Sequence, residues 1–568
     1  MALRLGDILV ERGIIKPQEL QIAVNEQQRT KKMLGQVLVD MGMVTERKLL
    51  DVLAEQQGVA YVELKDINID EKVIRSVPAK FVWHYKVMPI SIEDNVLTIA
   101  ISNPFDLWPV DDLEAHLGFR VEKVLATSGD ILEAIRKYYG VGADTIEKIL
   151  SVNSETKGSK FAEMTDKIED LEKMSESASI IKLVNQILKQ AINDRATDIH
   201  MEVFREDLTL RYRIDGILYD TQVSDDIKYL YPAIISRIKV MSGLDIVEKR
   251  LPQDGRAKVK IGNTEYELRT SVIPTLSGEN VVIRILPTTM LFDIANLGIL
   301  KKDLETLERL IKTPNGIIFV TGPTGSGKTT TLYACLSRLN TRQRKILTIE
   351  DPIEYELKGI SQTQINPKIG LSFAKILRSM LRHDPDVMMV GEVRDFETAE
   401  VTIQTALTGH LVFSTIHTND AASGITRLID IGIEPYLIAS SVQAFIAQRL
   451  VRVICPKCKT EDTQQMVEMK DKIEADLKDM FKKLPSKIRV FKGNGCKACN
   501  NTGYAGRIGI YEILLVGAEI KKLILQKVSS DMIKDKAVEL GMRTLRQDGW
   551  EKVLEGITTP EEVIRVTQ

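Results

Sequence analysis

The sequence contains no long hydrophobic run. No apolar stretch approaches the roughly 18–20 residues that a membrane-spanning helix needs. The first residues, MALRLGDILVERG, lack the apolar centre of a secretory signal. We therefore expect a cytoplasmic chain without a transmembrane segment.

The chain also lacks an excess of charge of either sign. Its 77 basic and 79 acidic residues leave a formal net charge of −2. This balance provides no global basic field, and no alternation of aromatic and basic residues suggests a groove for nucleic acid. Binding to nucleic acid is therefore not expected.

Cysteine is scarce, with five in 568 residues. Four of them form two CxxC pairs, Cys455 with Cys458 and Cys496 with Cys499, which is not the spacing of a disulfide framework. Two such pairs can complete a tetrahedral zinc site with no open position, so the metal would hold shape. A redox pair is the alternative, but no thioredoxin-like unit accompanies either pair. Cys335 is expected to be a buried small hydrophobe.

The length of the chain exceeds what one hydrophobic core supports, so we expect several domains. Strand-like runs at 59–64, 96–102 and 121–127 give the first region a mixed character. The polar composition of 141–176 predicts a linker that is partly helical and has little apolar surface to pack. The expected regions are an N-terminal domain (1–140), a linker (141–176), an α+β domain (177–287), an α/β core (288–454), a cysteine element (455–499) and a helical C-terminal region (500–568).

The segment GIIFVTGPTGSGKTTTLYACL (316–336) has the spacing of a phosphate-binding loop. An apolar β run precedes the glycines and a helical pattern follows them, as the motif requires. Lys328 is expected to reach the β- and γ-phosphates of ATP, and the Thr329 hydroxyl to ligate Mg²⁺. Backbone N–H groups of the loop are expected to surround the phosphates. The expected nucleotide contacts are Gly322, Pro323, Thr324, Gly325, Ser326, Gly327, Lys328, Thr329 and Thr330.

Acidic residues follow two further apolar runs. Glu392 comes just after VMMV in DPDVMMVGEVRD, where a carboxylate can deprotonate the attacking water, so we interpret it as the catalytic base. The run ILTI ends in Glu350, Asp351 and Glu354, which are expected to hold Mg²⁺ or its water shell. For each of these acids, a solvated strand end or a helix cap is the alternative.

A histidine follows a third run. In ALTGHLVFSTIHTNDA (406–421), Thr415 and His417 lie at the end of an apolar strand pattern. Ligands bind beyond the carboxyl ends of strands in open α/β sheets, so His417 is expected to face the same crevice and to position a phosphate. His410, before the strand, is as readily structural.

Together these motifs resemble the secretion ATPases, the hexameric motors of type II secretion and type IV pili. GPTGSGKTT, TIEDPIE, MMVGEVRD and TGHLVFSTIHTND occur in the family's order, and the likeness extends upstream through ATDIHMEV (196–203). It covers 177–568, including the cysteine element, which the secretion and pilus-extension motors carry. The resemblance implies a multidomain α/β fold with a RecA-like P-loop ATPase core, preceded by an α+β (PAS-like) domain.

The same resemblance assigns roles to four arginines. Arg269 and Arg284 precede the P-loop, and Arg378 and Arg382 lie in LRSMLRHDPD; all four would reach nucleotide phosphates at a site shared between domains and subunits. They would neutralise charge that develops on the transferred phosphoryl group. A surface ion pair is the alternative for each arginine, and which of them act in trans stays open.

The N-terminal domain opens with a tandem repeat, LGDILVERG… and LGQVLVDMG…, in which each copy ends in a glutamine. Helical spacing of its leucines is explained equally well by packing alone. The repeat also resembles the tandem motif by which some pilus and secretion ATPases bind cyclic di-GMP, which would make this a regulatory domain. Met33 stands where the first copy has an arginine, which weakens the second half-site. The implied contacts are Arg4, Leu5, Gly6, Leu9 and Gln27 in the first copy, and Leu34, Gly35, Leu38 and Gln56 in the second.

The resemblance therefore implies a homo-hexamer that hydrolyses ATP with Mg²⁺. It would power type IV pilus assembly at a platform protein, on the cytoplasmic face of the inner membrane. A motor of type II secretion or of a DNA-uptake pilus is the nearest alternative. A nucleic-acid translocase and a nucleotide-gated scaffold that does not hydrolyse ATP are more distant ones.

Overall fold

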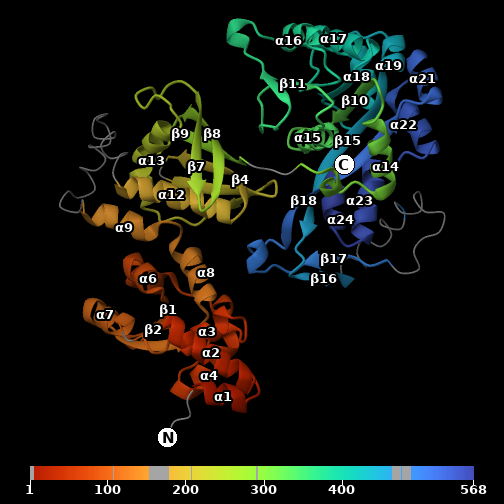
Figure 1. The fold of residues 1–568 in the computed structure, drawn as a ribbon. Helices are drawn as coiled ribbons and strands as arrows, with labels where there is room; N and C mark the ends of the chain where they lie inside the picture. Colours follow the sequence, from red (N-terminus) through yellow and green to blue (C-terminus); the bar gives the residue numbers. More distant parts are fainter. Residues whose placement is uncertain are drawn as a thin grey trace. The chain divides into compact units, whose positions relative to one another are not determined.

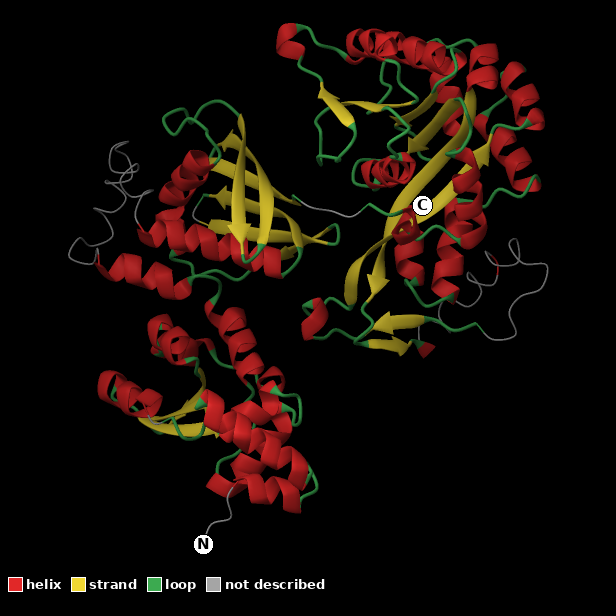
Figure 2. Cartoon of the chain, viewed as in Figure 1, coloured by secondary structure: helices red, strands yellow, loops and turns green. Residues whose placement is uncertain are grey.

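The computed structural model describes residues 5–106, 108–152, 178–205, 207–288, 292–463, 475 and 488–567. These residues form two compact units that divide between Leu286 and Pro287 (Figure 1). Both units combine helices and strands, so the predicted α/β class is confirmed (Figure 2). None of the described helices has both the length and the hydropathy needed to cross a bilayer.

The first unit begins with four short helices that share one hydrophobic core with a three-stranded sheet. Leu9 and Leu38 from the repeat and Leu97 and Ile99 from the sheet are fully buried in the same cluster. The strand β2 pairs antiparallel with β1 and parallel with β3. The elements are α1 (Leu5–Glu11), α2 (Pro17–Thr30), α3 (Leu34–Asp40), α4 (Glu46–Gln57), η1 (Leu64–Asp66), α5 (Glu71–Ser76), α6 (Ala79–Tyr85), β1 (Met88–Glu93), β2 (Val96–Ile101), α7 (Trp108–Leu117), β3 (Arg120–Leu125) and α8 (Ser128–Tyr139).

The strand expected at 59–64 is not formed. Tyr61 makes a single parallel β bridge to Leu125, and the chain then turns into η1. Leu64 is only 4% exposed, because this turn places it in the core. The apolar run is therefore buried without forming a strand, which periodicity alone does not distinguish.

The segment expected as a partly helical linker begins with a helix that packs into a hydrophobic cluster. Helix α9 (Ala143–Val152) places Ile146 and Ile149 in one hydrophobic cluster with Leu183 of α12 (Ala178–Asn193). The spacing of three residues puts both isoleucines on one helical face. A stripe this short is hidden when composition is averaged over 141–176. The remainder of that linker, 153–176, lies outside the described residues.

The α+β domain is a six-stranded sheet in the order β6-β5-β4-β9-β8-β7, covered on one face by two helices. Alternate residues such as Ile199, Met201 and Ile283 pack under the helices, whereas their sequence neighbours project to the opposite face. The predicted strands at 208–215 and 264–273 correspond to β5 and β8. The elements are α12 (Ala178–Asn193), β4 (Ala196–Phe204), β5 (Asp207–Ile214), β6 (Ile217–Asp220), α13 (Ile227–Met241), β7 (Gln253–Ile261), β8 (Thr264–Thr275) and β9 (Gly278–Pro287).

The second unit is built on a seven-stranded sheet in the order β12-β11-β13-β14-β10-β15-β18. The first six strands are parallel, and β18 is antiparallel to β15. The elements before β15 are η2 (Ile294–Leu297), α14 (Lys301–Leu310), β10 (Gly316–Thr321), α15 (Lys328–Leu339), β11 (Ile346–Glu350), β12 (Ser361–Gln364), η3 (Pro367–Ile369), α16 (Phe373–Met380), η4 (Leu381–His383), β13 (Val387–Val390), α17 (Phe396–Leu407), β14 (Leu411–Ile416), α18 (Ser423–Ile431) and α19 (Pro435–Ser441). Then follow β15 (Val442–Ile454), β16 (Lys459–Glu461), β17 (Phe491–Gly493), η5 (Lys497–Cys499), β18 (Tyr504–Leu515), α21 (Ala518–Leu525), α22 (Ser530–Glu539), α23 (Leu545–Leu554) and α24 (Pro560–Thr567).

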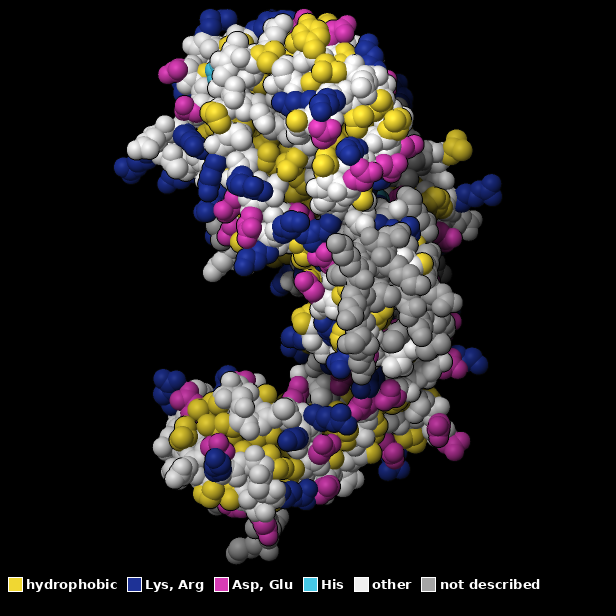
Figure 3. Space-filling model, turned by 90° about the vertical axis from the view of Figure 1, so that its right-hand side faces the viewer, with side chains coloured by type: hydrophobic (Ala, Val, Ile, Leu, Met, Phe, Trp, Pro, Cys, Tyr) yellow, Lys and Arg dark blue, Asp and Glu magenta, His cyan; other side chains and the backbone are white. Residues whose placement is uncertain are grey.

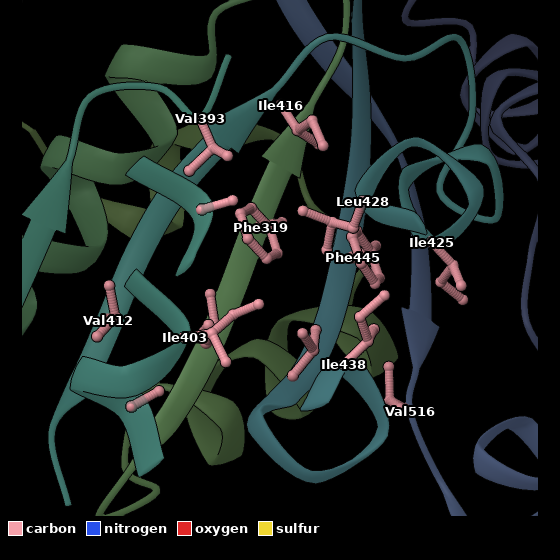
Figure 4. Packing of buried hydrophobic residues seen from close by; sticks show 14 of the residues in the cluster. Phe319, Val393, Ile403, Val412, Ile416, Ile425, Leu428, Ile438, Phe445 and Val516 are labelled. Atoms are coloured by element: carbon pink, nitrogen blue, oxygen red, sulfur yellow. The ribbon is translucent and has the colours of Figure 1, made fainter. Parts of the chain in front are cut away.

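Helices cover both faces of this sheet. Ile317 and Phe319 of β10 pack into one cluster and Ile318 and Val320 into another, so the strand is buried on both sides. Figure 4 shows Phe319 beside Phe445 of β15; the two rings are stacked with centroids 5.3 Å apart. A continuous apolar run is the pattern expected of such a central parallel strand.

The C-terminal region differs from the helical segment that the sequence predicts. It begins with β18, which pairs with β15 along most of its length and completes the core sheet. The cysteine element is therefore an excursion between two neighbouring strands of one sheet. Sequence reasoning missed β18 because its partner lies before that excursion.

Candidate active site

The glycine-rich loop joins β10 to α15 at the centre of the sheet. Gly322, Gly325 and Gly327 have φ angles of 150°, 79° and 88°, which side chains disfavour. A Cβ on Gly322 would lie 2.6 Å from the carbonyl oxygen of Gln448, and one on Gly327 would lie 2.8 Å from the Gln448 Nε2. Glycine is therefore required here by conformation and by the close approach of β15.

Lys328 is the first residue of α15 and folds back over the loop. Its Nζ donates hydrogen bonds to the carbonyl oxygens of Gly322 at 2.8 Å and Pro323 at 3.0 Å. Burial lowers the pKa of Lys328 to about 8, while Glu392 opposes this shift and Arg449 adds to it. The amine can exchange these carbonyl oxygens for phosphate oxygens.

ATP binding is expected to weaken as the pH rises above about 8. The free amine loses its proton near that pH, whereas a bound phosphate favours the charged form and raises the pKa. Binding should therefore take up protons at pH 8–9, on the order of half a proton per site. Calorimetric titration in two buffers of different ionisation enthalpy measures this uptake. Lys328→Gln should show none, and an affinity that stays constant across this range would contradict the prediction.

Strand order brings Glu392 to the edge of the sheet where the P-loop lies. Glu392 follows β13, which neighbours β14, which in turn neighbours β10. Its carboxylate lies 2.6 Å from Arg394 Nε through one oxygen and 3.5 Å from His417 Nε2 through the other. The structure thus brings Glu392 and His417 together, and Glu392 is near enough to Lys328 to influence its pKa. Arg394 was not singled out from the sequence, although its position two residues beyond Glu392 in the same motif is a usable signal.

Hydrogen bonds from neighbouring strands fix the backbone around Glu392. Gly391 N donates to the Ile349 carbonyl at 2.7 Å, Thr415 Oγ1 donates to the Gly391 carbonyl at 2.7 Å, and Val393 N donates to the Thr415 carbonyl at 2.9 Å. Thr415 therefore serves the site by holding the turn that carries Glu392.

Of the three predicted acids, Glu350 is the one that is buried and hydrogen-bonded to several other residues of the protein. It is 3% exposed and accepts hydrogen bonds from Tyr333, from Thr348 Oγ1 at 2.6 Å and from Gln362 Nε2 at 3.0 Å. These bonds join α15, β11 and β12. Asp351 is exposed and Glu354 partly buried in the loop that follows. The geometry favours these two over Glu350 as the acids that meet a metal ion or its water shell.

The four predicted arginines divide between the two units. Arg378 Nη1 lies 2.8 Å from the Glu397 carboxylate on the exposed side of α16, and Arg382 Nη1 donates to the Arg378 carbonyl at 3.0 Å. Arg269 on β8 and Arg284 on β9 line one cavity of about 480 Å³. Each unit therefore carries one pair of closely placed arginines.

The four paired cysteines lie together. Their Sγ atoms are all within 4.8 Å of one another, with separations of 3.8 Å (Cys455–Cys496), 3.9 Å (Cys458–Cys499) and 3.7 Å (Cys496–Cys499). A tetrahedral zinc ion with Zn–S bonds of about 2.3 Å places its sulfurs about 3.8 Å apart. Backbone N–H groups of Cys496 and Gly503 lower the pKa of Cys499 to about 7, although burial opposes the shift. The donor set fits zinc. Cys335 is buried, 1% exposed, as expected.

A cavity of about 550 Å³ lies where the two N-terminal repeats meet. Four of the predicted contacts line it: Leu5, Gln27, Leu34 and Gly35. The loop after β2, residues 102–105, forms part of its wall, and nothing in the repeat predicts this. Met33 and Phe105, which also line the cavity, are 56% and 53% exposed. Figure 3 shows hydrophobic side chains gathered on this domain.

The remaining predicted contacts shape the cavity or lie apart from it. A Cβ on Gly6 would lie 2.7 Å from Leu20, and a Cβ on Gly35 would lie 2.9 Å from Leu49, so glycine lets each short helix approach the next one. Leu9 and Leu38 are fully buried in the core, and Gln56 is exposed at the end of α4. Arg4 lies outside the described residues.

The chain is similar to known proteins along its whole length. The profile described as "Type II/IV secretion system protein" matches residues 173–565, and that of the MshEN domain matches residues 57–145. The type IV pilus assembly ATPase PilB of Myxococcus xanthus is 42% identical over 570 residues, 99% of each chain. The type II secretion system protein E of Xanthomonas campestris is 39% identical over 571 residues, 100% of this chain and 98% of its own. A solved structure titled "Structure of MshE with cdg" is 30% identical over 24% of this chain and 99% of its own, with a TM-score of 0.23.

The family profile covers more than half of the chain, and relatives align along its whole length. The resemblance inferred from the sequence is therefore confirmed. The chain belongs to the type II/IV secretion system protein family and is an ATPase of the PilB/GspE kind.

Proposed function

We propose that the chain is a homo-hexameric motor that hydrolyses ATP with Mg²⁺ to power type IV pilus assembly. It acts in the cytoplasm, at the inner membrane, where it drives pilin addition through a platform protein. The observation that carries this proposal is the meeting of Lys328, Glu392 and His417 at one edge of the core sheet. Arg269 and Arg284 are assigned to the nucleotide phosphates in this proposal, so that hydrolysis is coupled to a conformational change of the motor.

Each group has a separate task in the proposed reaction. Lys328 and the loop N–H groups bind the phosphates, and Thr329 contributes a hydroxyl to Mg²⁺. Glu392 orients the attacking water and takes its proton. His417, 3.5 Å from Glu392, fixes the orientation of that carboxylate or contacts the γ-phosphate. The arginine pairs stabilise charge on the transferred phosphoryl group.

Type II secretion is the second candidate, because a secretion protein E also aligns along the whole chain at nearly the same identity. A strain lacking the chain, complemented with wild type or Glu392→Gln, distinguishes the two. Loss of surface pili in electron micrographs, with secreted proteins unchanged, supports pilus assembly. Loss of secretion with pili intact would assign the chain to type II secretion, and loss of DNA uptake alone would assign it to an uptake pilus.

We also propose that the N-terminal cavity binds cyclic di-GMP. The two repeats face each other reciprocally: Leu34 lies 3.4 Å from the Cβ position of Gly6, and Leu5 lies 3.6 Å from that of Gly35. A site with such internal symmetry suits a ligand that is itself two-fold symmetric. Leucine side chains can cover the guanine faces, and the Gln27 amide can bond to a base edge or a phosphate.

Binding of cyclic di-GMP should respond in opposite directions to two substitutions. Gln27→Ala removes a hydrogen-bonding group from the cavity and should weaken binding about tenfold. Met33→Arg supplies the cation that the second repeat lacks and should strengthen binding by a similar factor. Titration calorimetry measures both, and Gln28→Ala, on the exposed side of α2, is the matched control. Unchanged affinity in both variants would show that cyclic di-GMP does not bind in this cavity.

A further inference from the structure

A row of charged residues crosses the antiparallel sheet of the first unit. Asp198 on β4 is paired directly with Arg213 on β5 and with Arg284 on β9. Arg256 on β7 is paired directly with Arg269 on β8, the strand next to β9. Directly opposite residues project to the same face. We call these five residues the arginine row. Four of them, all except Arg213, line the cavity of about 480 Å³.

Two carboxylates hold the arginines of this row in pairs. Asp198 Oδ1 lies 3.0 Å from Arg284 Nε, and its Oδ2 lies 3.8 Å from Arg213 Nε. Glu267 Oε1 lies 3.5 Å from Arg269 Nε and 3.8 Å from Arg256 Nη1. Asp198 is 7% exposed, whereas the Arg284 side chain is 55% exposed. A buried anion thus anchors a guanidinium that solvent can reach.

One pair of facing residues in the β7–β8 hairpin carries like charges, whereas two other facing pairs carry opposite charges. Across β7 and β8, Lys258 faces Glu267 and Lys260 faces Glu265, so these charges are complementary. Arg256 faces Arg269, and two like charges directly opposite each other destabilise a sheet. Local conflicts of this kind are expected where function requires them. The arginine row therefore places positive charges close together. This arrangement destabilises the sheet and is not required by packing.

We propose that Asp198 and Glu267 are positioning residues for ATP hydrolysis, acting through Arg284 and Arg269. This inference rests on the proposed role of these two arginines at the nucleotide phosphates. Arg284 donates a hydrogen bond from Nε to Asp198 at 3.0 Å, whereas Arg269 Nε forms a longer ion pair with Glu267 at 3.5 Å. A guanidinium with a fixed plane presents two parallel donors to a phosphate and loses little freedom when it binds. The carboxylates thus orient the arginines before the nucleotide arrives.

A double-mutant cycle on the full-length protein tests this. Asp198→Asn keeps the size and one acceptor but removes the charge, and should lower kcat about tenfold with little change in KM. Arg284→Ala should lower kcat further, and the double variant should be no slower than Arg284→Ala alone, because Asp198 acts through that arginine. Glu267→Gln with Arg269→Ala forms a second, independent cycle should the first variant fold poorly.

Glu202→Gln is the matched control, because Glu202 is a carboxylate on the same strand that pairs with Arg211 outside the cavity. It should leave kcat unchanged. Multiplicative losses in the double variants would overturn the positioning role while leaving the arginines in the mechanism. Wild-type kcat in both Arg284→Ala and Arg269→Ala would overturn the proposed arginine function and this inference with it.

Discussion

Replacement of Glu392 by glutamine is expected to lower the rate of ATP hydrolysis by about 10²- to 10⁴-fold and to leave ATP binding intact. Glutamine has the same shape and retains an oxygen for Arg394 Nε, which lies 2.6 Å from the carboxylate. It cannot take a proton from the attacking water. The loop glycines and Lys328, which we expect to bind the phosphates, are untouched. Steady-state phosphate release measures the first effect, and titration with a fluorescent ATP analogue measures the second.

Glu519→Gln is a suitable control, because Glu519 is half-exposed on α21 and pairs only with Lys522 among the ion pairs found. Its hydrolysis rate should equal that of the wild type. Phosphate release at the wild-type rate from Glu392→Gln would remove this residue from catalysis. Loss of ATP binding in that variant would instead mean that Glu392 supports the phosphate loop.

The parts of the site that could be predicted are those whose chemistry is contiguous in sequence. The phosphate loop places its glycines and Lys328 within a few residues, because the backbone itself wraps the phosphates. Glu392 and His417 each follow a strand in the sequence. Because the carboxyl ends of parallel strands meet at one edge of a sheet, the two residues are expected on the same edge, and they lie 3.5 Å apart.

The parts that could not be predicted depend on pairing between distant segments. The hydrogen bonds that hold Glu350 come from Tyr333 and Gln362, which lie on other elements. Asp198 faces Arg284, 86 positions later, only because β4 pairs with β9. Likewise β18 is a core strand because β15 accepts it across the cysteine excursion. The local sequence pattern does not indicate which distant segments will pair.

We expect the four paired cysteines to bind zinc, and we expect loss of that ion to destabilise the second unit by an amount on the order of several kcal/mol. The four thiolates close the excursion between β15 and β18, and they hold the small β16–β17 ladder beside them. Without a metal ion the sulfurs, 3.7–3.9 Å apart, would repel as thiolates or relax as thiols. Cys499→Ser should therefore reduce the zinc content, measured by atomic emission, from one ion per chain toward zero. It should also lower the melting temperature.

Cys335→Ala separates this effect from the loss of any buried sulfur. Cys335 is also buried but lies on α15, away from the four zinc cysteines, so its variant should keep its zinc while losing some packing energy. Because β15 approaches Gly322 and Gly327 through Gln448, loosening of the β15–β18 pair should also reduce ATP hydrolysis in Cys499→Ser. A Cys499→Ser protein with full zinc content and unchanged melting temperature would contradict a structural zinc site at these cysteines.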